Sequence, residues 1–133
     1  MTEYVSKQVA INKPDSMIYM SLSNFDNFSP MLKDKVEGWQ ATVDNCSFKL
    51  KGFTLKLKML EKEPCKTIKI SGDDIPFEFY FWVQLHQVAE GDTRMRLTIH
   101  AKLNKMMKMM IGKKLQKGVD EMANQIANSF NNI

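Results

Sequence analysis

Histidines and carboxylates offer this sequence few candidates for catalysis. His86 and His100 are its only histidines, and both fall on the polar phase of an alternating segment. A general base must lie within about 3 Å of the proton it takes, directly or through one water, so outward-facing histidines do not qualify. The Asp73-Asp74 pair falls in a turn, where carboxylates commonly support the backbone. We predict no catalytic residues, which favours a binding protein over an enzyme without excluding enzymatic activity.

Cysteine usage and the known nucleotide and hydrolase motifs point the same way. Cys46 and Cys65 are too few and too scattered for a disulfide scaffold or a zinc site. The sequence contains no Walker loop, no Ser-x-Gly elbow and no His-rich helix. We therefore predict no metal and no cofactor, and we expect both cysteines to be reduced in a cytoplasmic protein.

Length and charge set the class of protein. The 133 residues predict a single domain spanning 1–133, large enough for a proper core. A net charge of +4 and a pI near 9.0 fall short of a dedicated nucleic-acid binder, so we predict no nucleic-acid partner. The N-terminus lacks the apolar region of a signal peptide, and no run of about 18 apolar residues occurs, so we expect no stable membrane insertion.

Alternating segments in the first two thirds of the chain predict strands with one apolar and one polar face. The segment from Phe53 to Met59 interleaves apolar residues with Thr54, Lys56 and Lys58. A hairpin is predicted across Glu90-Gly91-Asp92. In that register Leu85 opposes Leu97, Gln84 opposes Thr98, and Trp82 opposes His100. The opening strand, residues 4–11, is expected to place Val5, Val9 and Ile11 on one face.

The last segment, residues 104–130, has the spacing of one long amphipathic helix. Its apolar residues recur every three or four positions, at Met107, Ile111, Leu115, Val119, Met122, Ile126 and Phe130. We expect Leu115, Val119, Met122 and Ile126 to pack in the core. Gly112 interrupts the segment and predicts either a bend or close packing on the sheet, and we favour the bend.

The order of these elements resembles the helix-grip fold of the START-like (SRPBCC) superfamily. Val9 and Ile11, followed by Pro14, Ile18 and Leu22, look like the opening of small bacterial polyketide cyclase/dehydrase-like members, and TRMRLTIHAKLN before a long helix is similar to their closing hairpin. The resemblance implies an α+β fold: a curved antiparallel sheet of six to seven strands wrapped around a long C-terminal helix, with two short helices after the first strand.

The resemblance implies a shape and a tendency to bind apolar molecules such as lipids or polyketide-like compounds. The glycine-rich loop of plant members is absent, since the corresponding turns hold only Asp44-Asn45 or Gly52, and no catalytic group of the aromatic-ring cyclases matches a position here. We predict a modest pocket, toward the small end of about 300–1,000 Å³. Its expected ligand-binding walls are Phe53, Leu55, Phe79, Phe81, Leu97, Met107, Ile111 and Leu115.

Further hypotheses accompany the prediction of a hydrophobic-ligand binder. The fold could serve as a protein-interaction module without a cavity, or as a cyclase or dehydratase-type enzyme. Tyr80 and Trp82 are large aromatics on a polar strand phase, which favours a homodimer through that sheet face. The methionines around Met107, flanked by lysines, are expected either to pack on neighbouring elements or to form a pliable lip or partner-binding patch, with Met107 and Met110 on the buried stripe.

Overall fold

The computed structural model describes residues 1–50, 53–75 and 77–133, without the side chains of Met31, Leu50 and Phe53. The chain opens with two short strands and three short helices: β1 (Thr2–Val5), β2 (Val9–Ile11), α1 (Asp15–Leu22), the 3-10 helix η1 (Phe25–Phe28) and α2 (Ser29–Leu32). Six strands and a long helix follow: β3 (Glu37–Ala41), β4 (Asn45–Leu50), β5 (Phe53–Glu63), β6 (Thr67–Gly72), β7 (Phe79–Ala89), β8 (Asp92–Ala101) and α3 (Lys105–Asn131).

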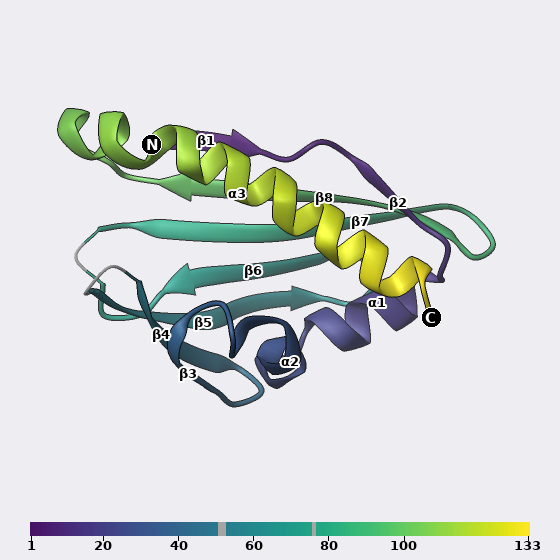
Figure 1. The fold of residues 1–133 in the computed structure, drawn as a ribbon. Coiled ribbons are helices and arrows are strands. Elements are labelled where there is room, and N and C mark those ends of the chain that lie inside the picture. Colours follow the sequence, from purple (N-terminus) through teal and green to yellow (C-terminus); the bar gives the residue numbers. More distant parts are fainter. Residues whose placement is uncertain (51–52, 76) are drawn as a thin grey trace.

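The described strands form one eight-stranded antiparallel sheet in the order β1-β8-β7-β6-β5-β4-β3, with β2 also paired to β8. Figure 1 shows α3 running across one face of this sheet, from the end of β8 toward α1. We call this the helix-side face, and the opposite one the outer face. The predicted α+β helix-grip architecture is confirmed. The sheet exceeds the expected six or seven strands because the opening strand is broken in two.

Ser6 marks the break between β1 and β2. Its N–H donates to the carbonyl of Leu97 at 2.8 Å, and its Oγ accepts from the N–H of Leu97 at 2.9 Å. The side chain thus replaces a backbone partner where the strand leaves its ladder. The break also shifts the alternation, so Tyr4 is buried with Val9 while Val5 is half-buried. The expectation that Val5 shares the face of Val9 is wrong.

The β7–β8 hairpin is confirmed, with a different register. Its turn is Glu90-Gly91, with Gly91 at a positive φ of 65°, and a bulge precedes it between Gln87 and Ala89. The structure pairs Val83 with Leu97, Trp82 with Thr98, Tyr80 with His100 and Gln84 with Arg96, two residues away from the predicted partners. A two-residue shift keeps every side chain on its face, because side chains alternate with a period of two.

Strand β5 follows the predicted alternation of apolar and polar residues in its first half and departs from it after a bulge. Leu57 is half-buried while Lys56 and Lys58 are exposed, as predicted. A bulge between Met59 and Glu61 then inserts an extra residue, so the faces exchange beyond it. Lys62 therefore pairs with buried Ile68 on the helix-side face.

Helix α3 packs chiefly against β1, β2 and β8, along one side of the sheet. Its buried stripe beyond Gly112 contains Val119, Ala123, Ile126, Ala127 and Phe130. Met122 is 36% exposed, so its predicted core position is wrong. Ala123 and Ala127 are buried instead, and their small side chains allow the helix to approach the sheet closely.

Gly112 lies within a continuous α3 and is buried. A Cβ added there would lie 3.0 Å from the hydroxyl oxygen of Tyr4 on β1. The glycine therefore serves close packing of the helix on the sheet, the alternative that we did not favour from the sequence.

Candidate functional site

The predicted ligand-binding residues fall into three groups. Leu97 is fully buried, and the side chain of Phe53 lies outside the described part of the structure. The other residues, on the helix-side face and on α3, are all half-buried: Leu55, Phe79, Phe81, Met107, Ile111 and Leu115. Half-buried apolar side chains still have solvent-accessible surface that a bound ligand can cover, whereas the side chain of Leu97 has none.

The position of α3 explains this grouping. Because α3 covers β8 and the two opening strands, Leu97 on β8 lies under the helix. Phe81, on the neighbouring strand β7, packs against the core from only one side and stays half-buried. On α3, Leu115 likewise contacts the core while keeping partial exposure. The helix-side face therefore carries a partly uncovered apolar strip beside α3.

A depression of about 850 Å³ lies where β6 leads into β7 and β8 leads into α3. Phe79 and Met107 belong to both its lining and the predicted set. Its volume falls toward the upper end of the range for ligand sites, above the size expected from the sequence. The remaining apolar lining includes Phe77 and Leu103, beside the polar residues Lys58, Ser71, Asp74, Glu78 and Lys102.

Ser71 is the most informative polar residue of this lining. It is 6% exposed, and among the described residues its Oγ has no hydrogen-bond partner. Buried hydroxyls are normally paired, so this one is an exception. In the sheet register Ser71 opposes Lys58 and Tyr80, which also line the depression, so its side chain lies on the outer face. The sequence pattern did not single out Ser71, because this residue precedes Gly72-Asp73-Asp74 and is predicted to belong to a turn.

Charges around the depression are balanced. Lys58 and Lys102 line it together with Asp74 and Glu78. Such a lining does not select a strongly anionic or cationic ligand, because its two lysines are matched in number by two carboxylates. The combination of apolar rings, balanced charge and an unpaired hydroxyl suits a mostly apolar molecule that carries neutral oxygen atoms.

His100 lies on the outer face of the sheet, as the polar phase of its strand predicts. His100 pairs through Nε2 with the carboxylate of Glu3, and its ring lies 4.6 Å from that of Trp82 in an edge arrangement. The Nζ of Lys69 lies 4.9 Å from the ring centroid of Tyr80 and 5.4 Å from that of Trp82. These residues therefore interact with one another through an ion pair and aromatic contacts. In the described structure His100 faces away from the helix-side face.

Cys46 lies beside a second, smaller depression of about 410 Å³. Burial raises the pKa of its thiol to about 12, although the backbone at Leu57 opposes this shift. Only a thiolate is a good nucleophile, so Cys46 is a neutral, structural side chain at physiological pH. No group of three potential metal-ligating His, Cys, Asp or Glu residues occurs within the described ranges.

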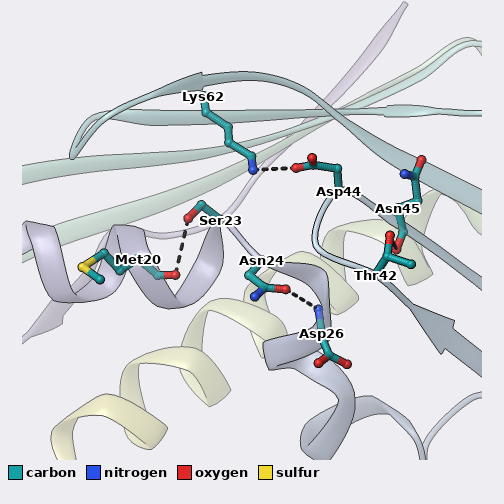
Figure 2. Close-up of polar contacts among 8 residues, drawn as sticks. All are labelled: Met20, Ser23, Asn24, Asp26, Thr42, Asp44, Asn45 and Lys62. Atoms are coloured by element: carbon teal, nitrogen blue, oxygen red, sulfur yellow. Dashed lines mark hydrogen bonds and ion pairs between the residues drawn. The ribbon is translucent and has the colours of Figure 1, made fainter.

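Polar contacts between the short helices and the β3–β4 turn are structural. Figure 2 shows Lys62 of β5 paired with Asp44, and Asn24 Oδ1 accepting from the N–H of Asp26 at 2.9 Å. The N–H of Phe25 also donates to the carbonyl of Val43 at 3.0 Å. These contacts tie η1 and β5 to the β3–β4 turn. They account for Lys62, which the bulge in β5 turns to the helix-side face.

The described helices include none that is both long enough and apolar enough to cross a membrane.

Solved structures share this architecture at low sequence identity. The Aha1 dimer from Colwellia psychrerythraea is 18% identical, with a TM-score of 0.65 over 98% of this chain and 97% of that chain. A START superfamily protein from Mycobacterium smegmatis is 12% identical, with a TM-score of 0.63 over 93% of this chain and 96% of that one. The di-domain ARO/CYC BexL from the BE-7585A biosynthetic pathway is 12% identical, with a TM-score of 0.74 over 96% of this chain and 46% of that one.

Sequence comparison adds no family to this picture. No family model matches the chain, and no curated protein matches it. At the identities above, structural likeness carries information about the fold alone. The chain therefore has the helix-grip fold shared by START-like and polyketide cyclase-type proteins.

Proposed function

We propose that this protein binds a small hydrophobic molecule, lipid-like or polyketide-like, without transforming it. The observation that supports this most is the depression of about 850 Å³, whose lining includes Phe79 and Met107 of the predicted set. Phe79 and Phe81 are half-buried on the helix-side face of β7, and Ile111 and Leu115 are half-buried on α3, which adds apolar surface near the depression. Binding would remove this surface from water, which favours association.

The unpaired Ser71 hydroxyl refines the class of ligand. A saturated chain would leave Ser71 Oγ unpaired, whereas a carbonyl or hydroxyl of a polyketide-like compound can pair with it. Balanced charge around the depression also disfavours a ligand held mainly by ionic contacts. We therefore favour an oxygenated, mostly uncharged apolar molecule over a plain fatty acid.

Nile red, a neutral apolar fluorophore, tests the site directly. Met107→Trp places a large ring in the depression and is expected to abolish the fluorescence gain. Met20→Trp is the matched control, because Met20 is 73% exposed on α1, away from the depression. Equal probe binding by both variants would place binding elsewhere. Absence of probe binding by the unaltered protein would instead favour a protein-interaction module.

The ligand class needs a second experiment. An anthraquinone and anthracene, which has no oxygen, are compared as competitors of Nile red, using the unaltered protein and Ser71→Ala. We expect the anthraquinone to compete better, and Ser71→Ala to weaken the anthraquinone alone, because only that ligand can use the hydroxyl. A variant that weakens both ligands equally would contradict the role of Ser71. Native mass spectrometry of protein from its source then identifies a co-purified molecule.

The homodimer through the outer face also remains a proposal. Tyr80 and Trp82 lie with their ring centroids 5.9 Å apart, and aromatic side chains are enriched at protein interfaces. Sedimentation equilibrium should give twice the monomer mass, and Trp82→Glu should return the monomer. A monomeric unaltered protein at high concentration would rule out this dimer.

A further inference from the structure

The first half of α3 carries an unusual concentration of positive charge. Residues 104–119 contain five lysines and no acidic residue. The whole chain has a net charge of +4, so the remainder of the protein is close to neutral. The lysines are Lys105, Lys108, Lys113, Lys114 and Lys117. This segment is therefore where the protein would meet an anionic partner.

Three methionines of the same segment are exposed to solvent. Met106, Met109 and Met110 are 71%, 79% and 66% exposed. The predicted buried position of Met110 is thus wrong, whereas Met107 is half-buried. Methionine is usually an interior residue, so three neighbouring exposed ones form an apolar patch that needs an explanation. We call Met106, Met109 and Met110 the methionine patch.

Helix geometry fixes the patch in place. The Oδ1 of Asn104 accepts from the N–H of Met107 at 2.8 Å and caps the helix, so the patch lies on the first two turns of a capped helix. Met106, Met110, Lys113 and Lys117 follow one another at intervals of four, three and four residues, which places them on one face. The buried residues Gly112, Val119 and Ala123 occupy another face.

The patch is also free to approach a flat surface. Figure 1 shows the first turns of α3 projecting past the end of β8. Met107, half-buried between the patch residues in sequence, lines the 850 Å³ depression. A surface that contacts the methionine patch would therefore lie beside the mouth of that depression.

We propose that the methionine patch and its surrounding lysines dock the protein reversibly on an anionic lipid surface. Apolar side chains with lysines around them are the pattern of helices that lie in a membrane interface. The methionine tips would enter the headgroup region while the ammonium groups meet lipid phosphates. A nucleic acid would use the lysines and leave the methionines in water, so the patch favours lipid. This inference concerns a surface and does not depend on the proposed ligand.

Sedimentation with vesicles tests the proposal. One set is phosphatidylcholine alone, and the other contains equal parts of phosphatidylcholine and phosphatidylglycerol. We expect binding only to the second set, weakened by added salt because exposed charges are screened. Met106→Gln with Met110→Gln should reduce binding by about tenfold, and Lys113→Gln with Lys117→Gln by a similar factor. Glutamine preserves helix propensity, so the fold should remain intact.

Matched controls carry the same substitutions elsewhere. Met17→Gln with Met20→Gln changes two exposed methionines of α1, and Lys33→Gln with Lys35→Gln removes two exposed lysines. Both controls should bind as the unaltered protein does, and circular dichroism should confirm the helix content of every variant. Failure to bind anionic vesicles would overturn the proposal. It would equally be overturned if the methionine variant bound normally, which indicates a charge-only contact with any polyanion, or if the controls lost as much binding.

Discussion

The hydroxyl of Tyr4 lies directly over Gly112, where a Cβ would come within 3.0 Å of its oxygen. Gly118, six residues along the same helix, has nothing within 4 Å of its Cβ position. Both glycines weaken a helix by roughly 1 kcal/mol relative to alanine. Their surroundings therefore predict opposite consequences for the same substitution.

Gly118→Ala should raise the free energy of unfolding by about 1 kcal/mol, because it gains helix propensity in open space. Gly112→Ala gains the same helix propensity, but its new methyl group is too close to the Tyr4 hydroxyl, and this clash offsets the gain. Gly112→Ala should therefore be less stable than Gly118→Ala by about 1 kcal/mol or more. Urea titrations of the two variants measure the difference. Equal stabilisation would mean that Tyr4 moves aside without cost.

Tyr4→Phe tests the same contact from the other side. Within the described residues the Tyr4 hydroxyl is buried and has no hydrogen-bond partner, so its removal should be neutral or stabilising. In the Tyr4→Phe background, Gly112→Ala should become stabilising by about 1 kcal/mol, since the crowded oxygen is gone. An unchanged effect of Gly112→Ala in this background would show that the backbone, and not the hydroxyl, limits the site.

Ile126 lies on the buried side of α3, whereas Met122 lies on its exposed side. Ile126 is 4% exposed, and Ile126→Ala should lower the free energy of unfolding by about 2–5 kcal/mol. Met122 is 36% exposed, and Met122→Ala should change it by less than about 1 kcal/mol. Thermal or urea unfolding decides the matter. A large loss of stability in Met122→Ala would contradict the orientation of α3 about its own axis, which leaves Met122 exposed.

The two thiols should react at very different rates. Cys46 is buried and its pKa is raised to about 12, whereas Cys65 is half-buried. With a thiol-exchange reagent at mildly alkaline pH, Cys65 should be modified first. Cys65→Ser should then react only as fast as the protein unfolds, because the Cys46 thiolate is scarce below its pKa. Rapid reaction of Cys65→Ser under native conditions would show that Cys46 is accessible.

Asp120 should make stability depend on acid pH. The N–H of Lys7 and the Gln116 side chain donate to its carboxylate, at 3.0 and 3.2 Å, and lower its pKa below the ordinary value of 3.8. A lowered folded-state pKa contributes stability above the unfolded value, and this contribution disappears as pH falls through the folded value. Unfolding midpoints of the unaltered protein and Asp120→Asn should converge as pH drops below 3.8. A constant difference would contradict this role.

Alternation and helical spacing already determine most of the fold. Leu57 lies inward with Lys56 and Lys58 outward, because a strand with one buried face admits only one phase. Val119, Ile126 and Phe130 are buried at helical spacing for the same kind of reason. The local pattern is sufficient to predict burial here, because burial of these residues depends only on which face of their own strand or helix is apolar.

The placement of one element on another was decided by tertiary structure. Leu97 and Phe81 share a sheet face, yet only Leu97 is fully buried, because α3 covers β8 and leaves β7 partly open. Ser71 and Leu103 line the same depression from segments far apart in sequence. No short-range pattern encodes such a meeting, which depends on how twisted strands and a helix pack at a distance. The sequence thus determined the faces of the elements, and packing between elements determined which residues remain available to bind.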